Sequence, residues 1–213
     1  MNLLADQLLV LSLLINFVVL GTSRLGFAVR AVALQGMLLG ILPALIHPFS
    51  WHLVGIVTGM LLAKGVVIPW MIMNAIRKAE ISHEVDPFLG YISTLVLGAI
   101  FTTLAFVFAA KLPLAPEHAG LLFVPASIAT IMCGFLVLMA RRKAISQVIG
   151  YLIMENGIFI FGLLLADAMP VLVEAGALLD LLVGVFVMGI VINHINREFS
   201  SLDTSRLSAL REE

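Results

Sequence analysis

The sequence predicts an all-α, polytopic membrane protein with about seven transmembrane helices. Hydrophobic residues make up 62% of the 213 residues, the mean hydropathy is +1.14 and only 12% of the residues are charged. A soluble domain is about half apolar and about a quarter charged. In addition, polar segments divide the chain into apolar stretches of about the 20 residues that a helix needs to cross a bilayer. No soluble domain fits between these stretches.

Charged residues and turn formers set the limits of the first four helices. No basic segment precedes the first apolar stretch, so this stretch is expected to remain in the protein as a helix and not to serve as a signal peptide. The breaks that follow are Ser23-Arg24, HPFSW, RKAEISHEVDP and KLPLAPEH. The helices expected between them cover 3–22, 27–46, 51–76 and 88–110.

Three more helices are expected in the C-terminal half, at 119–140, 145–166 and 170–194. The basic triplet at 141–143 separates the first two, and the segment ADAMP at 166–170 separates the last two. The remaining residues, 201–213, are polar and are expected to form a cytoplasmic tail.

The basic residues predict the orientation of the helices. With seven spans and the N-terminus outside, all twelve Lys and Arg residues except Lys64 and Lys111 fall in or beside cytoplasmic segments. Cytoplasmic loops of membrane proteins carry an excess of Lys and Arg. The pattern therefore predicts an N-out, C-in topology, whereas six or eight spans would scatter the charges.

A weak internal repeat is also present. The segments that follow Arg24 and Arg141 align at one offset, which matches Gly65 with Gly184 and Asn74 with Asn193. Internal repeats of membrane proteins often frame a binding site or ion path. Two three-helix repeats joined by a linker helix are therefore possible, with residues 1–118 forming the N-terminal helices and 119–200 a C-terminal three-helix domain.

Three ionisable residues lie deep inside expected helices: Lys64, Glu155 and Asp180. A charge at the centre of a membrane helix costs about 2.5–3.5 kcal/mol on insertion scales, and such groups usually serve ion or proton movement. Glu155 and Asp180 are the candidate proton relay, and Lys64 is either a further carrier or the partner of a carboxylate. A purely structural hydrogen-bonding role is the alternative for each.

Glu174 and His194 are possible accessory groups near the two ends of the last helix. The other histidines lie in loops, and no His pair has ligand spacing, so no metal site is expected. The single cysteine, Cys133, excludes disulfides within the chain. No basic tract indicates nucleic acid, and no catalytic motif is present. Membrane hydroxyl groups are expected to bond mostly to their own helices; they are Ser93, Thr94, Thr102, Thr103, Ser127 and Thr130.

The C-terminal third resembles a known family. RRKAISQVIGYLIMENG, followed by ALLDLLVGVFVMGIVINHINRE, is similar to the three-helix K subunit of respiratory complex I and to the C subunit of multi-subunit sodium/proton antiporters. In that resemblance Asp180 takes the place of the second buried acid. Glu155 departs from the pattern, because the first glutamate of the family would fall near Tyr151 or Leu152, about one turn earlier.

The whole chain resembles the hydrogenase-4 component E family, whose members are membrane subunits of formate hydrogenlyase-type complexes. The resemblance implies a bacterial or archaeal inner-membrane location and antiporter-like and oxidoreductase subunits as neighbours. Iron–sulfur and metal centres would lie in partner subunits, with no cofactor in this chain. Proton or sodium translocation would then be coupled to electron transfer elsewhere. The alternatives are a structural bridging subunit, a subunit of a related antiporter or oxidoreductase, and a stand-alone transporter.

Overall fold

The computed structural model is an all-helical bundle in its described part, which comprises residues 2–46, 50–78, 83–84, 87–113, 122–165 and 189. Six helices in this part are long and apolar enough to cross a membrane. The elements in chain order are α1 (Asn2–Gly21), α2 (Leu25–Ile46), α3 (Trp51–Leu62), the π-helical turn η1 (Ala63–Val67), α4 (Ile68–Lys78), α5 (Tyr91–Ala109), α6 (Phe123–Ala140) and α7 (Ala144–Leu165). The predicted fold class is confirmed; the seventh expected helix, 170–194, lies outside the described residues.

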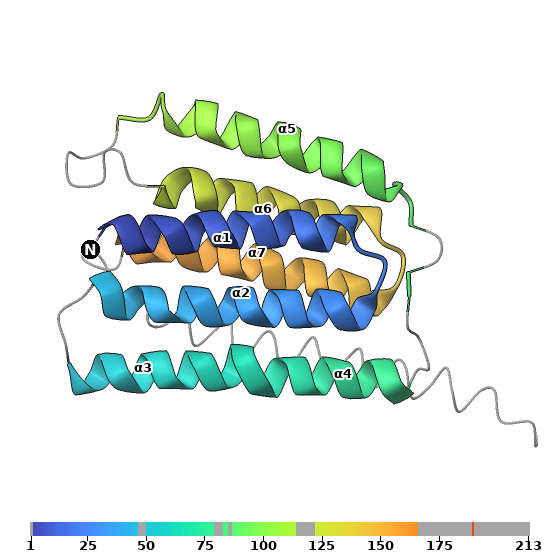
Figure 1. Ribbon diagram of the computed structural model, residues 1–213, viewed down its shortest axis with the longest axis horizontal. Helices are drawn as coiled ribbons and strands as arrows, with labels where there is room; N and C mark the ends of the chain where they lie inside the picture. The colour runs from blue at the N-terminus through green and yellow to red at the C-terminus, as the bar shows by residue number, and fades with distance from the viewer. Residues whose placement is uncertain are drawn as a thin grey trace, which may run out of the picture.

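The helices stand side by side, as Figure 1 shows. Helices α1, α2, α6 and α7 form the centre. Helix α5 covers α1 and α6 on one side, while α3, η1 and α4 form one long helix that packs on α2 on the other side. The helix limits differ from the predicted ones by a few residues. The largest differences within the described residues are at the starts of α5 and α6, which begin at Tyr91 and Phe123 instead of near 88 and 119.

The late start of α5 has a local cause. The backbone N–H of Phe88 donates to the carbonyl of Ala140 at 2.8 Å, so this residue joins the neighbouring loop and does not begin the helix. Gly90 then precedes α5 in an extended conformation. The chain between α4 and α5 is thereby tied to the end of α6.

Three connections meet at one end of the bundle. An isolated β-bridge joins Arg24 to His83, and the N–H of Glu84 donates to the carbonyl of Ser23 at 2.9 Å. Glu84 also accepts bonds from the backbone of Arg142 and Lys143 at 3.3 Å each and from the Ser146 hydroxyl. This carboxylate therefore caps the first turn of α7, where a negative charge is favourable.

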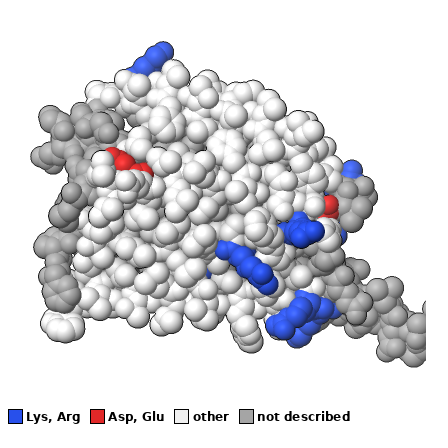
Figure 2. All heavy atoms as spheres, viewed as in Figure 1, with Lys and Arg blue, Asp and Glu red and all other residues white. Residues whose placement is uncertain are grey.

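We call this end the basic end, because Lys and Arg side chains gather there on the face shown in Figure 2. Arg141 is buried there (3% exposed) and donates to the carbonyl of Leu20 at 2.8 Å, and its guanidinium stacks on the Tyr91 ring at 4.1 Å. Burial lowers the pKa of Arg141 from its ordinary value. Arg141 thus ties the end of α6 to the last turn of α1, which agrees with the prediction that the segments around Arg24 and Arg141 lie on the same side.

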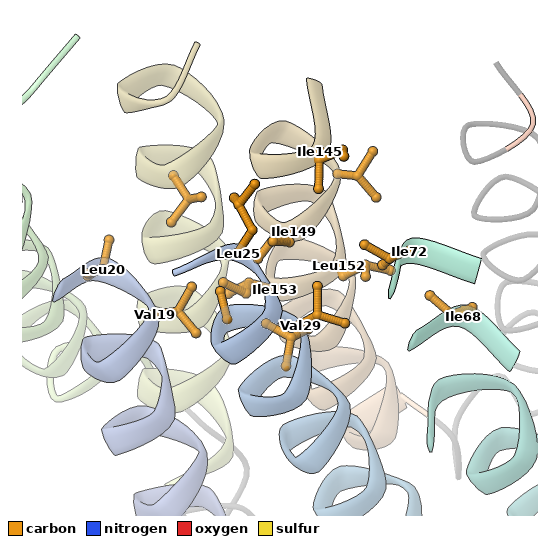
Figure 3. Close-up of a cluster of buried hydrophobic side chains, with 14 of the residues drawn as sticks. Val19, Leu20, Leu25, Val29, Ile68, Ile72, Ile145, Ile149, Leu152 and Ile153 are labelled. Atoms are coloured by element: carbon orange, nitrogen blue, oxygen red, sulfur yellow. The ribbon is translucent and has the colours of Figure 1, made fainter. Parts of the chain in front are cut away.

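Two features hold the centre together. Apolar side chains from α1, α2, α4, α6 and α7 form a cluster near the basic end (Figure 3), which includes Val19, Val29, Ile72, Ile149 and Ile153. Helices α6 and α7 also approach until their backbones touch. A Cβ atom at Gly134 would lie 2.4 Å from the nitrogen of Met154, and Gly150 and Gly157 face α6 in the same way. Small residues allow this close approach between membrane helices.

Candidate functional site

Lys64 occupies an unusual stretch of backbone. It lies on η1, where the N–H of Ile68 reaches back five residues to the carbonyl of Ala63. Pro69 follows directly; it has no N–H to donate, and in an α-helix its ring would press on the carbonyl four residues earlier, at Gly65. A widened π turn relieves this clash, and such turns are frequent at functional sites. The altered hydrogen bonding covers Ala63–Val67 and therefore includes the turn that carries Lys64.

Lys64 forms an ion pair with Glu155 of α7. The Nζ atom lies 2.8 Å from Oε1 of Glu155, and the side chains are 14% and 3% exposed. The same Nζ donates to Oδ1 of Asn156 at 3.1 Å and lies 5.4 Å from the centroid of the Phe159 ring. Each charge thus compensates the other, which reduces the cost of holding both away from water. This geometry makes Lys64 the partner of a carboxylate; its role as a further proton carrier stays a prediction.

The second oxygen of Glu155 is unused. Oε2 is buried and has no hydrogen-bond partner among the described residues. An ionised carboxylate can accept several hydrogen bonds, so this atom has free capacity to receive a proton or a donor. Oε1 of Glu155 is therefore occupied by Lys64, whereas Oε2 remains able to accept a hydrogen bond or a proton.

A continuous line of hydrogen bonds extends from the ion pair across the bundle. Asn156 donates to Gln35 Oε1 at 3.1 Å; Gln35 donates to Asn16 Oδ1 at 2.8 Å and to Ser12 Oγ at 2.9 Å; Asn16 donates to Thr130 at 3.0 Å. We call these groups the polar row. Its members are Lys64, Glu155, Asn156, Gln35, Ser12, Asn16 and Thr130, from η1, α7, α2, α1 and α6.

The polar row lies at one depth. Its members are all within about a turn of the middle of their helices, with the α3–η1–α4 segment taken as one helix. The helices are roughly parallel to one another (Figure 1). The row therefore runs sideways through the bundle, parallel to the expected plane of the membrane, and not from one membrane face to the other.

Sequence reasoning singled out Lys64 and Glu155 but missed the amides of the row. Ser12 and Asn16 are one turn apart on α1, and Gln35 is the lone amide of α2. These positions were the available signal for polar contacts between helices. The expectation for the membrane hydroxyls is met by Ser127 and Thr103, which donate to Val124 and Ala99 of their own helices. Thr130 departs from it because its oxygen also accepts from α1.

Glu84 was also missed, since it appeared to be part of a solvated loop. The structure buries it at the basic end (4% exposed). Asp180, Glu174 and His194 lie outside the described residues, so their placement relative to Glu155 stays a prediction. Among the described residues, no group of three His, Cys, Asp or Glu side chains could hold a metal ion.

Replacing Gln35 by leucine tests how much the polar row contributes to the stability of the protein. The change would leave Asn16 Oδ1 and the Asn156 amide without their partners, and each unpaired buried group costs about 1–3 kcal/mol. We expect a clear drop in the melting temperature of the detergent-solubilised protein, measured by differential scanning fluorimetry. Gln147→Leu is the control, because Gln147 is exposed on α7; equal melting temperatures for the two variants would contradict the prediction.

Comparison with known proteins gives three findings. Residues 122–212 match the family model for NADH-ubiquinone/plastoquinone oxidoreductase chain 4L. The chain is 30% identical to hydrogenase-4 component E of Escherichia coli K12 over 70% of its own length and 69% of that protein, and the same values hold for the Shigella flexneri protein. It is also 30% identical to the uncharacterized protein Rv0085 of Mycobacterium tuberculosis, over 86% of this chain and 85% of that one. No solved structure matches the chain.

Proposed function

The chain belongs to the hydrogenase-4 component E family and is a complex-I-like multi-pass membrane subunit, and from this premise we propose that it moves protons within a membrane-bound oxidoreductase. The name of its relative, hydrogenase-4 component E, is the basis for proposing hydrogenase subunits as partners. In this proposal the chain has no active site of its own. Redox centres lie in partner subunits, antiporter-like membrane subunits are its neighbours, and the complex is in the bacterial or archaeal inner membrane.

The ion pair of Lys64 and Glu155 is the observation that carries the proposal. A proton can pass directly from Nζ to Oε1 over 2.8 Å, which converts two charged groups into two neutral ones. The pair as a whole is neutral before and after this transfer, so the transfer leaves no net charge in the bundle. Such a pair can change its protonation when a charge approaches or leaves.

The free oxygen of Glu155 gives the pair a second connection. A proton that arrives at Oε2 neutralises the carboxyl and weakens its hold on Lys64, which can then release its own proton. The charge balance is one proton in and one proton out. Asp180 is the proposed next carrier beyond Glu155, with Glu174 and His194 as accessory groups nearer the two ends of its helix.

The amides of the polar row have a different part in this mechanism. Neutral amides do not take up protons at ordinary pH, but they accept and donate hydrogen bonds to the groups that do. Asn156 accepts from Lys64 and is itself held by Gln35. The row therefore holds Lys64 in reach of Glu155 and extends the polar interior toward α1 and α6.

The proposed proton transfer is tested by Glu155→Gln in the intact complex. Glutamine keeps the shape and the hydrogen-bonding capacity of the side chain but cannot bind and release a proton. We expect proton uptake coupled to electron transfer in membrane vesicles to fall to background, with the complex still assembled. A sodium-coupled variant of the same scheme would show as a loss of sodium uptake in the same vesicles.

Lys111→Gln is the matched control, because Lys111 is exposed at the end of α5; its vesicles should pump normally. Normal pumping by the Glu155 variant would reject the proton role. The bridging alternative has its own support, since side-chain hydrogen bonds of the polar row join α1, α2, η1, α6 and α7. If the subunit is only a structural bridge, Glu155→Gln should prevent assembly of the complex before it alters transport.

A further inference from the structure

Two small pockets follow one another along the seam between α2 and α7. Each offers about 20 Å³ to the centre of a water molecule, which is enough for one water. We call the one near the basic end the outer pocket and the other the inner pocket. Both are lined by α2 and α7, and together they extend from the basic end to the ion pair.

The outer pocket has a wall that is partly polar. It runs from exposed Arg24 inward to buried Ala28, and Glu84, Arg141 and Ser146 also line it. Nη1 of Arg141 is buried and has no hydrogen-bond partner among the described residues. A water needs two or more polar partners to occupy such a site, and this wall provides them. Glu84 also offsets the charge of Arg141, so the pocket is not strongly repulsive toward cations.

The inner pocket ends at the polar row. Lys64 and Asn156 form its deep end, and the remaining walls are apolar: Val29, Val32, Ala33, Gly36, Ile68, Pro69, Ile72 and Leu152. Gly36 leaves room here, because a Cβ at this position would lie 3.0 Å from Cβ of Lys64. A water in this pocket can accept from the ammonium of Lys64 and donate to the amide oxygen of Asn156.

The linings of the two pockets are neighbours in the sequence: the outer lining ends at Ala28 and Ile149, and the inner lining begins at Val29 and Leu152. Val29, Ile149 and Leu152 belong to one buried apolar cluster, and we call this packed stretch the constriction. Figure 3 shows Val29, Ile149 and Leu152 turned into this part of the bundle. From Ser146 to Asn156, the stretch of α7 that lines the two pockets rises by about 15 Å, which is half of the roughly 30 Å hydrocarbon core.

We infer that the α2–α7 seam is a water-gated half-channel that connects the basic end with Lys64. Hydrophobic constrictions close by dewetting and open when water enters. When the constriction at Val29 and Leu152 fills, water links the inner pocket to the outer one, and the proton that Lys64 releases when Glu155 is neutralised leaves along this water to the basic end. Glu84 is a positioning residue at the mouth, since its two oxygens hold the first turn of α7. The inference deepens the proposed function and rests on it.

Silver ions test the route, because Ag⁺ is small and reacts with thiolates. In the intact complex, Cys133→Ala first removes the native thiol, which is fully buried. Single cysteines are then placed at Ala28 in the outer pocket, at Ala33 in the inner pocket and at Leu39 as the control. Leu39 is equally buried on α2 (1% exposed) but lines neither pocket. Protection by Ag⁺ is read as loss of maleimide labelling after denaturation.

With Ag⁺ added on the side of the basic end, in vesicles of defined orientation, we expect protection at positions 28 and 33 but not at 39. Position 33 should react more slowly than 28. Val29→Ala should speed the reaction at 33 by about tenfold or more, because it widens the constriction, and leave 28 unchanged. Reaction at 39 as fast as at 33, or none at 33 even with Val29→Ala, would overturn the half-channel.

The outcome is independent of the pumping test. If Glu155→Gln pumps normally, the proton role of the ion pair fails, whatever silver labels. If Glu155→Gln stops pumping but silver never reaches position 33, the proton role stands and the half-channel is wrong.

Discussion

Lys64→Met is expected to destabilise the protein more than any other single change in the polar row. Methionine matches the length of lysine but leaves Glu155 buried without its counter-charge. Removal of one partner of a buried pair costs about 3–5 kcal/mol. The measurement is the free energy of unfolding in detergent, with assembly followed on native gels.

The double variant Lys64→Met with Glu155→Gln separates a relay from a structural role. Neither residue is charged, and replacement of a buried ion pair by neutral groups is often nearly neutral for stability. We therefore expect the double variant to recover most of the stability that Lys64→Met loses. If the pair carries protons, coupled pumping stays at background in this stable complex. Recovery of pumping together with stability would show that the two side chains only fasten η1 to α7.

Gly134→Leu is expected to prevent close packing of α6 against α7. Even an alanine Cβ at this position would lie 2.4 Å from the Met154 nitrogen and 2.8 Å from the Gly150 oxygen. Both contacts are with backbone, which cannot rotate away as a side chain can. Overpacking usually costs about 1–3 kcal/mol, sometimes more, and the larger leucine should exceed this range. The complex is then expected to lose the subunit, which native gels and membrane immunoblots detect.

Gly59→Ala provides the contrast. Gly59 lies on α3, and a Cβ there would have no neighbour within 4 Å. Because alanine is a better helix former than glycine by about 1 kcal/mol, this variant should be as stable as the parent protein or slightly more so. An equal loss of assembly in both variants would mean that glycine content, and not the α6–α7 contact, determines the result.

The fold could be predicted from the sequence because bilayer thickness fixes helix length. Stretches such as 2–21 and 25–46 are mostly apolar and end at charges or turns, so their limits follow closely. The π turn was only partly foreseen. Pro69 indicates that the α-helical bonding pattern must change, but the same residue permits a kink, a break or a widened turn.

The candidate site was predicted in its charges but not in its contacts. Lys64 and Glu155 stand out because their insertion is costly. Their pairing depends on how α7 and η1 are rotated about their axes, and the weak amphipathicity of membrane helices leaves no sequence signal for that rotation. Gln35 and Asn16 were missed for another reason: a lone amide in an apolar helix has the same sequence signature whether it bonds to a neighbouring helix or to its own backbone.

The common depth of the polar row has a consequence for its response to transmembrane voltage. An elementary charge gains or loses about 2.3 kcal/mol per 100 mV only when it crosses the whole membrane. A proton that passes between Lys64 and Glu155 changes its distance from either membrane face very little, so the electric field does almost no work on it. A complex that contains this subunit would therefore make this lateral proton transfer at the same energetic cost in a resting and in a fully energised cell.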